Sequence, residues 1–570
     1  MASELSERQL LGQRHGELKK LRQTFEEDWR AITGQFLQYR GRWYQSDHNR
    51  GKSKAPTLIN STPQRAMRIN NAGMMAGVTS PARIWFQLTV DDKTLKEKQS
   101  VREYLDKVAR LIREALAQGR WYQALAASVY PDLSGIGTGA NWMEANPEGG
   151  IRCEGLTPGE YWIDVDQNGI VDTIFRERTM SVRTLVQRWG LGAVSDNVRN
   201  SYKNNELARQ VVVVHAVFPN SDWKDGALGP QGMKYASRWW ERDTAHGQGF
   251  LAHGGYEEFP AQVPRWLVVS QECYGRGSPG WETVADAKAL QHRENRMYRL
   301  VDKTADPPMV AVDSLRHKRV SLLSADVTYV PGGTAGAAGF RPAQEIPPQA
   351  LTVLHQDIER HEDRIEKGFF VDLWLAILTD NRASPPTATE VTETRQEVML
   401  QLGPLLTQLN NELLQPAVVR CYEVLARQGR LPAPPPELAN AQGSVTVEFI
   451  SIMHQVQKLT AIVGIRELIS EIQALASIGM PEALDKVDSD AIVDELGEIL
   501  GIRPDIIRSP EQVEEVRRAK AQQAEAAQTG EAMVRATEGM KNMSASDPQK
   551  VSEMAAMMAP GAAAAQWGGG

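Results

Sequence analysis

Four residues in the middle of the chain have the types and spacing of a calcium-binding loop. They are Asp164, Asp166, Asn168 and Gly169. In an EF-hand loop, carboxylate and amide oxygens at these places hold the ion, and a bidentate glutamate closes the loop at its last position. That position is Phe175 here, and the flanking residues have strand rather than helix character. We therefore interpret Asn168-Gly169 as the turn of a β-hairpin over 160–178.

The cysteines and histidines do not form a catalytic or metal-binding pattern. The three cysteines, Cys153, Cys273 and Cys421, are too far apart for a disulfide framework or a Cys-x-x-Cys clip. No two histidines have His-x-x-x-His spacing, and His215, which follows four valines, is expected to pack within a strand. The glycine-rich segment 135–139 lacks the Lys-Ser/Thr of a phosphate loop. We expect no enzyme, no metal and no cofactor.

Charged residues on a predicted helix over 348–376 form two edges. The acidic edge is Glu359, Glu362, Asp363 and Glu366, and the basic edge, about 100° around the helix, is Arg360, Arg364 and Lys367. A helix with two opposite edges can lie beside a copy of itself, and such heterologous contacts can close into a ring. A solvated helix with internal i,i+4 pairs explains the same pattern, so both interpretations stay open.

Hydrophobic periodicity predicts a mainly helical α+β fold. The predicted helices are 4–40, 57–77, 94–118, 120–131, 181–190, 278–303, 348–376, 387–428, 455–478, 488–500 and 510–535. Strands are predicted between 139 and 270 and over 444–452, and Pro404 and Pro416 are expected to kink their helix. The Ala-, Met- and Gly-rich tail over 528–570 is expected to be disordered.

Composition and charge narrow the class of protein. The 570 residues are 42% hydrophobic and 24% charged, which is ordinary for a folded soluble chain. The net charge of −7 disfavours a protein that coats DNA with a basic surface, although it permits one that DNA merely passes. No apolar run is long enough to span a membrane, and the N-terminus lacks a secretory signal, so we expect folding in the cytoplasm.

Residues 58–88 resemble a block near the N-terminus of the head-to-tail connector (portal) proteins of short-tailed bacteriophages. The ending of that block, Thr-Ser-Pro-x-x-x-Trp-Phe-x-Leu, is matched by Thr79, Ser80, Pro81, Trp85, Phe86 and Leu88. Further matches follow in order at 161–164 with Gly169, 274–279, 387–397, 402–404 and 412–414. The resemblance covers about residues 5–500, and the number and order of the motifs make it specific.

This resemblance implies an elongated subunit of a ring, usually of twelve copies, at one capsid vertex. Its regions would be a wing over 1–277, a first stem helix over 278–305, a clip over 306–347, a second stem helix over 348–376, a channel loop over 377–386, a kinked long helix and wing strand over 387–454, a helical crown over 455–527 and the tail. The implied location is the virion, after synthesis in the host bacterial cytoplasm.

The implied partners are further copies of the chain, the terminase large subunit, a tail adaptor protein, the major capsid and scaffolding proteins, and double-stranded DNA in transit without sequence preference. No membrane is implied. In the presumed clip, Arg316, His317, Lys318 and Arg319 form a compact basic run that we expect to dock the motor or the tail. A solvated loop tip is the alternative.

The presumed conduit, residues 278–383, contains 13 Lys and Arg against 15 Asp and Glu. Because each phosphate held by a cation strengthens attachment, a conduit of balanced charge lets a duplex slide. We expect Arg364 and Lys367 to lie near the DNA, and Asn381 and Arg382 to touch it as a gate or brake. A loop packed between subunits is the alternative for that last pair.

Two other classes of protein compete with the portal interpretation. One is another virion component, either a tail adaptor or an internal ejection protein. The other is a nucleic-acid enzyme, which would need clustered carboxylates for Mg²⁺ or a phosphate loop. Neither of those features is visible in the sequence.

Overall fold

The computed structural model describes residues 6–38, 58–96, 98–244, 249–305, 307, 309–311, 340–342, 347–378, 403–439 and 445–449, with short stretches between 465 and 534. The chain divides into two units, residues 1–484 and 485–570. In the second unit, residues 512–524 are helical, as predicted, and Arg517 forms an ion pair with Asp490 at 2.7 Å. All elements below belong to the first unit.

The first helix, α1 (Glu7–Phe36), begins at a capping box in which Ser6 and Gln9 satisfy each other's backbone N–H groups. Its apolar residues recur every three or four positions, and Phe25, Trp29 and Phe36 are buried. This face packs on strand β4 and on helices α6 and α9. The predicted helix over 4–40 is therefore confirmed within the described residues.

A five-stranded antiparallel sheet has the order β4-β5-β6-β7-β8. Its strands are β4 (Tyr161–Val165), β5 (Val171–Ser181), β6 (Gln210–Pro219), β7 (Tyr235–Glu241) and β8 (Ala252–Tyr256). The predicted hairpin is confirmed as β4 and β5. Asp166 Oδ1 accepts the N–H groups of Asn168 and Ile170, at 2.8 Å each, and Gly169 has a φ of 77°. The carboxylate suggested as a calcium ligand thus shapes a turn.

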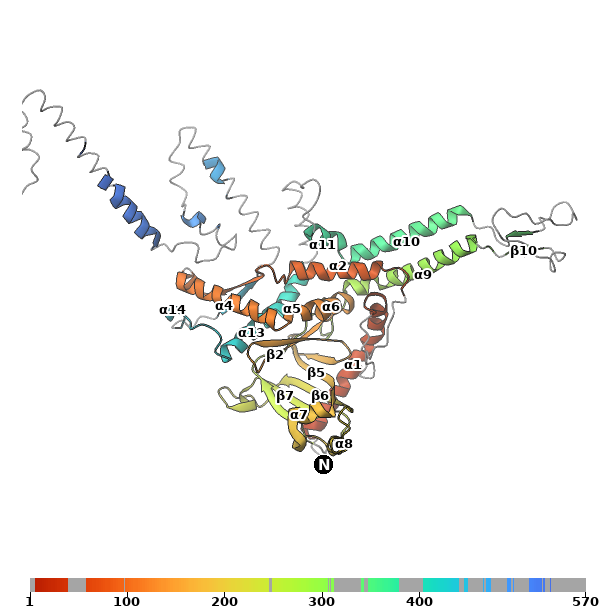
Figure 1. Ribbon diagram of the computed structural model, residues 1–570, viewed down its shortest axis with the longest axis horizontal. Coiled ribbons are helices and arrows are strands. Elements are labelled where there is room, and N and C mark those ends of the chain that lie inside the picture. The colour runs from red at the N-terminus through yellow and green to blue at the C-terminus, as the bar shows by residue number, and fades with distance from the viewer. Residues whose placement is uncertain are drawn as a thin grey trace, which may run out of the picture. The chain divides into compact units, whose positions relative to one another are not determined.

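Two smaller sheets lie beside helices in the same unit (Figure 1). One has the order β3-β2-β9, and the other pairs β1 with β12 antiparallel, which joins segments more than 350 residues apart. These strands are β1 (Phe86–Val90), β2 (Ala140–Ala145), β3 (Ile151–Leu156), β9 (Ala261–Gln262) and β12 (Val445–Phe449). The helices are α2 (Thr62–Gly77), α3 (Lys93–Lys96), α4 (Gln99–Gln118), α5 (Trp121–Ala124), α6 (Tyr130–Ile136), α7 (Val182–Ala193), α8 (Asp196–Lys203), α13 (Gln415–Arg427) and α14 (Pro436–Ala439).

Two helical stretches widen into π-helical turns just before a proline. The turns are Leu125–Val129, ahead of Pro131, and Asn410–Leu414, ahead of Pro416. Proline has no N–H and its ring crowds the preceding turn, so a wider turn relieves the clash. Pro416, where a kink is expected, follows one of these turns, while Pro404 lies at the edge of the described residues.

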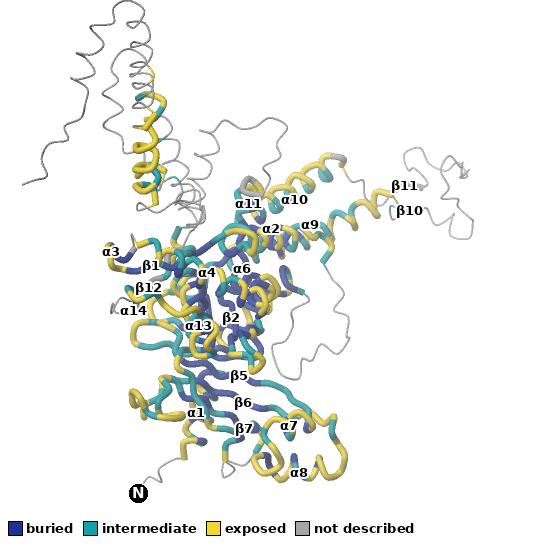
Figure 2. The backbone as a smooth tube through the Cα atoms, turned by 60° about the vertical axis from the view of Figure 1, so that its left-hand side comes forward, coloured by how far each residue is buried: buried dark blue, intermediate teal, exposed yellow. Residues whose placement is uncertain are grey.

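Two long helices, α9 (Pro279–Ala305) and α10 (Pro348–Gly368), lie side by side and extend away from the sheets (Figures 1 and 2). Beyond their distal ends, β10 (Met309–Ala311) pairs antiparallel with β11 (Phe340–Pro342). We call α9 and α10 together the arm. Within the described residues, no helix has the length and apolarity that crossing a membrane requires.

The predicted helix over 348–376 is wrong at its C-terminal end, because the chain breaks there into two helices. After α10, Phe370 has a φ of 55°, and α11 (Val371–Leu378) follows. Phe369 at the break is fully buried, and its ring lies 5.1 Å from that of Phe36. The break turns α11 onto α2, and burial of these side chains offsets the strained backbone.

Candidate functional site: the arm and its base

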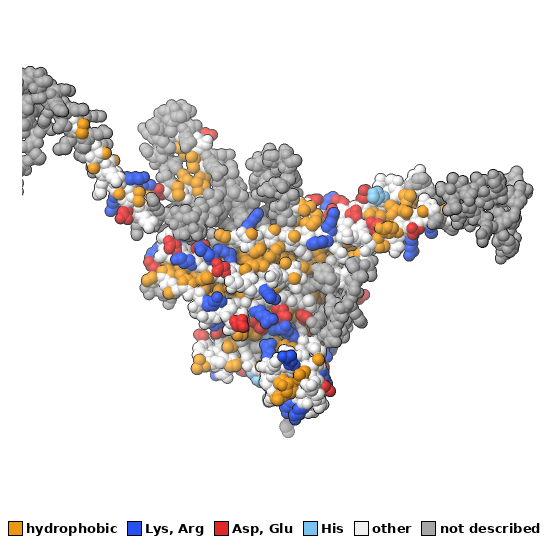
Figure 3. Space-filling view, in the orientation of Figure 1, with side chains coloured by type: hydrophobic (Ala, Val, Ile, Leu, Met, Phe, Trp, Pro, Cys, Tyr) orange, Lys and Arg blue, Asp and Glu red, His pale blue; other side chains and the backbone are white. Residues whose placement is uncertain are grey.

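The two helices of the arm share only a narrow apolar seam near their base. Ala287 and Leu290 of α9, Ile358 and Ile365 of α10, and Phe369 directly after α10 are buried. Farther out, none of the side chains described in 291–305 and 347–357 is buried. Three large apolar side chains there, Tyr298, Val301 and Val353, are 57%, 49% and 64% exposed. The outer arm therefore leaves apolar surface in water (Figure 3).

Ion pairs across the seam fix how α9 and α10 lie against each other. Arg293 Nε donates to Asp357 Oδ2 at 2.7 Å. On the next turns, Asp286 of α9 lies 2.8 Å from His361 Nδ1 and 3.5 Å from Arg364. The guanidinium of Arg364 is 58% exposed, so this contact positions the side chain more than it stabilises the fold.

The acidic edge of α10 is divided between α2 and water. Glu362 accepts hydrogen bonds from Asn60 Nδ2 at 2.7 Å and Thr62 Oγ1 at 3.1 Å, and Glu366 pairs with Arg65. Within the described part of the chain, the remaining two carboxylates pair with residues of α10 itself. These pairs are Glu359 with His355 at 3.4 Å and Asp363 with Lys367 at 2.8 Å, and the latter hydrogen bond raises the pKa of Lys367. In the single chain, two of the four carboxylates therefore contact residues at the start of α2, and the other two pair with residues of α10.

The basic edge of α10 continues into a groove between the outer parts of α9 and α10. The groove has a volume of about 900 Å³. Five cations line it, namely Arg293, Arg296, Arg299, Lys303 and Arg360, with the single carboxylate Asp357. Charge that is balanced along the sequence is therefore segregated in space, and the groove is strongly positive.

The base of the arm is fixed by the contact of α11 with α2. Trp374 Nε1 donates to Asn70 Oδ1 at 2.6 Å, and Asn70 Nδ2 donates to Ser134 Oγ at 2.9 Å. Gly73 allows the approach, because a Cβ there would overlap the indole ring of Trp374. The small residues in 58–77 therefore serve close helix packing.

The glycine-rich segments 135–139 and 275–280 pack against each other where α9 begins. Gly275 N–H donates to Thr138 Oγ1 at 2.8 Å, and Ser278 Oγ donates to the Gly135 carbonyl at 2.7 Å. A Cβ at Gly280 would overlap the Gly135 backbone. Ser278 thus ties the two segments together. The residue spacing carried no signal of this pairing, because the segments are about 140 positions apart.

A buried ion pair joins the segment before α9 to the helix that ends in α13. Arg265 donates from its backbone N–H to Glu412 Oε2 at 2.8 Å and from Nε to Oε1 at 3.0 Å. The Arg265 side chain is 2% exposed. Burial raises the pKa of Glu412 although Arg265 opposes this shift. Sequence reasoning singled out 412–414 as a motif but missed this partner.

The other predicted site residues divide into described and undescribed ones. Asn381 and Arg382, and Arg316, His317, Lys318 and Arg319, lie outside the described residues, so their roles stay predictions. Within the described part, no group of three or more His, Cys, Asp or Glu side chains has the arrangement of a metal site, and the three cysteines are free and buried. His215 is fully buried in β6, as predicted.

Residues 8–507 match the family described as "Bacteriophage head to tail connecting protein". The chain is 34% identical over 554 residues to the "Portal protein" of Salmonella phage epsilon15, covering 96% of this chain and 98% of that protein. It is 33% identical over 526 residues to the "Probable portal protein" of Bordetella phage BPP-1, covering 92% and 93%.

Among solved structures, a chain of the virion of a native gene transfer agent particle is similar over 82% of this chain and 99% of its own, with 13% identity and a TM-score of 0.33. That likeness is too distant to support an argument.

The two phage relatives and the family match extend over nearly the whole sequence, and they confirm the resemblance drawn from the motifs. The chain belongs to the bacteriophage head-to-tail connecting family, and it is a portal protein, a structural component of the phage virion.

Proposed function

We propose that this connector closes into a ring, of twelve subunits, through which double-stranded DNA enters the capsid during packaging and leaves during ejection. The observation that carries the proposal is the family match over residues 8–507. In this proposal α9 and α10 are the stem, residues 306–347 the clip, 377–386 the channel loop and 455–527 the crown, while the sheets and α1–α8 belong to the wing.

The surface of the arm supports a ring contact between neighbouring stems. One side has the positive groove, and the other has the solvent-facing carboxylates Glu359 and Asp363. Exposed Tyr298, Val301 and Val353 supply apolar surface that a neighbour would bury. A positive side meeting a negative side is a head-to-tail contact, the kind that closes into rings. Glu362 and Glu366 contribute indirectly, by bracing the stem on α2.

The channel would hold DNA weakly because its cations already have carboxylate partners. Arg364 lies 3.5 Å from Asp286, and Lys367 lies 2.8 Å from Asp363. A cation that is paired in this way releases few counterions when a phosphate passes. The channel loop, with Asn381 and Arg382, would then supply the transient contact that slows or retains DNA.

The ring is tested by native mass spectrometry and averaged top views of the purified protein. The expected particle has about twelve times the 63.2 kDa subunit mass and a central hole. A protein that stays monomeric at every concentration, and is missing from the unique vertex of the capsid, would contradict the proposal.

Two substitution sets test the regions. Replacing Asn381 and Arg382 with alanine is expected to lower DNA retention in filled heads, and unchanged retention would remove them as a gate.

Neutralising Arg316, His317, Lys318 and Arg319 is expected to impair docking of the terminase large subunit or the tail adaptor while rings still assemble. Normal docking would show that this basic run has another role.

A further inference from the structure

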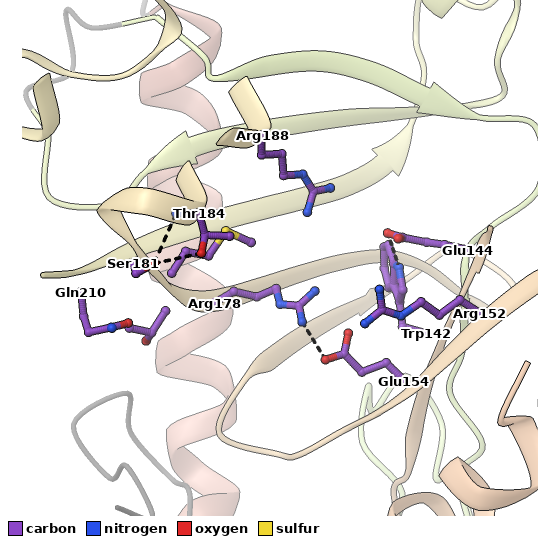
Figure 4. Close-up of a pocket in the computed structure, with 11 residues that line it drawn as sticks. Trp142, Glu144, Arg152, Glu154, Arg178, Ser181, Thr184, Arg188 and Gln210 are labelled. Carbon is purple, nitrogen blue, oxygen red and sulfur yellow. Dashed lines mark hydrogen bonds and ion pairs between the residues drawn. The ribbon is translucent and has the colours of Figure 1, made fainter. Parts of the chain in front are cut away.

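A second positively charged pocket lies far from the arm, between the two larger sheets. It has a volume of about 470 Å³ and is walled by β2, β3, β5 and the first turns of α7. Arg152, Arg178 and Arg188 come from three different elements, and their guanidinium groups point toward the same gap (Figure 4). The carboxylates in the wall are Glu144 and Glu154.

Both carboxylates are already used by other groups. Glu144 accepts from Trp142 Nε1 at 2.6 Å and from the buried Arg176 at 3.3 Å. Glu154 accepts from Arg178 Nη2 at 2.7 Å. Among the described residues, neither Arg152 nor Arg188 has a carboxylate within ion-pair distance. Two of the three guanidinium groups in the pocket, those of Arg152 and Arg188, are therefore left without a carboxylate among the described residues.

Packing holds one of these two arginines in place. The guanidinium of Arg188 lies over the rings of Trp189 and Trp239, at 4.9 and 4.7 Å. Burial lowers the pKa of His215, behind the wall, well below its usual value, and the nearby charges of Arg176, Arg188 and Arg178 lower it further.

We infer that this pocket binds an oxyanion, a carboxylate or a phosphate, between Arg152 and Arg188. Two guanidinium forks match the several acceptor oxygens of such a group. The pocket is large enough for a group bigger than one ion. Two sources carry this chemistry, namely a free phosphate and an acidic side chain of a second copy of the chain. The inference of oxyanion binding does not depend on ring formation, although the second source does.

The test is calorimetric titration of inorganic phosphate, at constant ionic strength, into the full-length chain in each oligomeric state that size-exclusion chromatography separates. Arg152→Gln and Arg188→Gln are each expected to weaken binding about tenfold, since each removes a charge-assisted contact. Arg152 is exposed and outside the core, so its variant folds even if Arg188→Gln does not. Arg183→Gln, an exposed arginine of α7 outside the pocket, is the matched control and is expected to bind as the wild type does.

The two sources give different results in the ring. If a free phosphate is the ligand, the ring binds it and the double variant leaves ring stability unchanged. If a neighbour's carboxylate fills the pocket, the ring excludes phosphate and the double variant lowers the temperature at which the ring dissociates. Absence of phosphate binding in every state, together with unchanged ring stability of the double variant, would overturn the inference. A chain that never forms rings but binds phosphate through these arginines would contradict the proposed function alone.

Discussion

In the five-stranded sheet, charged side chains are buried and partnered, whereas along the outer arm apolar side chains are exposed. Arg176, 1% exposed, donates to His215 Nδ1 at 3.1 Å, and His215 Nε2 lies 2.8 Å from Ser237 Oγ. On the arm, Val353 is 64% exposed. Buried polar groups are stable only when they are hydrogen-bonded, whereas exposed apolar surface is typical of sites that bind another molecule. Arg176 and His215 therefore find hydrogen-bond partners within one chain, whereas in the proposed ring a neighbouring subunit would cover the apolar side chains of the arm.

Removing a partner from a buried ion pair is expected to have the largest effect on the stability of the single chain. Glu412→Ala leaves Arg265 buried without its carboxylate, so we expect a loss of about 3–5 kcal/mol in the free energy of unfolding, measured with urea. Glu272→Ala removes an i,i+4 partner of the half-exposed Arg276, and we expect a loss below about 1 kcal/mol. Equal losses in the two variants would show that burial does not distinguish these pairs.

Acid is expected to destabilise the packing of α1 and the five-stranded sheet through two buried histidines, His15 and His215. Burial first, and then Lys19 and Arg22, lower the pKa of His15 to about 2, and burial lowers that of His215 as well. Below about pH 6.5 the unfolded chain binds protons that the folded chain does not, so stability falls as pH falls. The expected loss is about 1.4 kcal/mol per histidine per pH unit.

Urea unfolding at pH 7, 6 and 5 measures this slope. His15→Gln is expected to remove about half of it, because one of the two titrating groups is gone. Replacing the exposed His355 on the arm is the control, and we expect the slope to stay as in the wild type. A slope that is the same in all three proteins would contradict the assignment to buried histidines.

Gly73→Ala tests the contact between α2 and α11 at the base of the arm. The added methyl overlaps the Trp374 ring and must displace α11 or the indole, so we expect a loss of about 1–3 kcal/mol. Gly16→Ala, in the interior of α1 with open space around it, is expected to gain about 0.5–1 kcal/mol. Thermal unfolding of the two variants compares them directly, and a gain in both would mean that α11 moves freely on α2.

The smallest expected change in stability concerns the exposed residues of the arm. Val353→Ser is expected to change the unfolding free energy of the single chain by less than about 0.5 kcal/mol, since Val353 has few neighbours to lose. Sedimentation is nevertheless expected to show fewer rings. Ile170→Ser, at a hairpin turn with 61% exposure, is expected to leave both measurements unchanged. Normal ring formation by Val353→Ser would place the stem contact elsewhere.

The local sequence pattern was sufficient to predict those elements that are determined by residues close to one another in the sequence. The Asn168-Gly169 hairpin and the stripe of α1 follow from turn chemistry and from a 3.6-residue period, and both are confirmed. The break at Phe369 and Phe370 was missed because the helical period continues through it. Only the burial of Phe369 against α1, and of Trp374 against α2, makes two helices more favourable than one.

The sequence by itself determined the family, through motifs kept in order over nearly the whole chain, and the local elements that short-range periodicity specifies. The tertiary structure decided which distant groups meet: Arg265 with Glu412, Trp374 with Gly73, and the arginines around the second pocket. Such contacts depend on the relative placement of several elements, and residue spacing along one chain does not encode that placement locally. The same reason explains why charge that is balanced along residues 278–383 becomes a positive groove on one side of the arm.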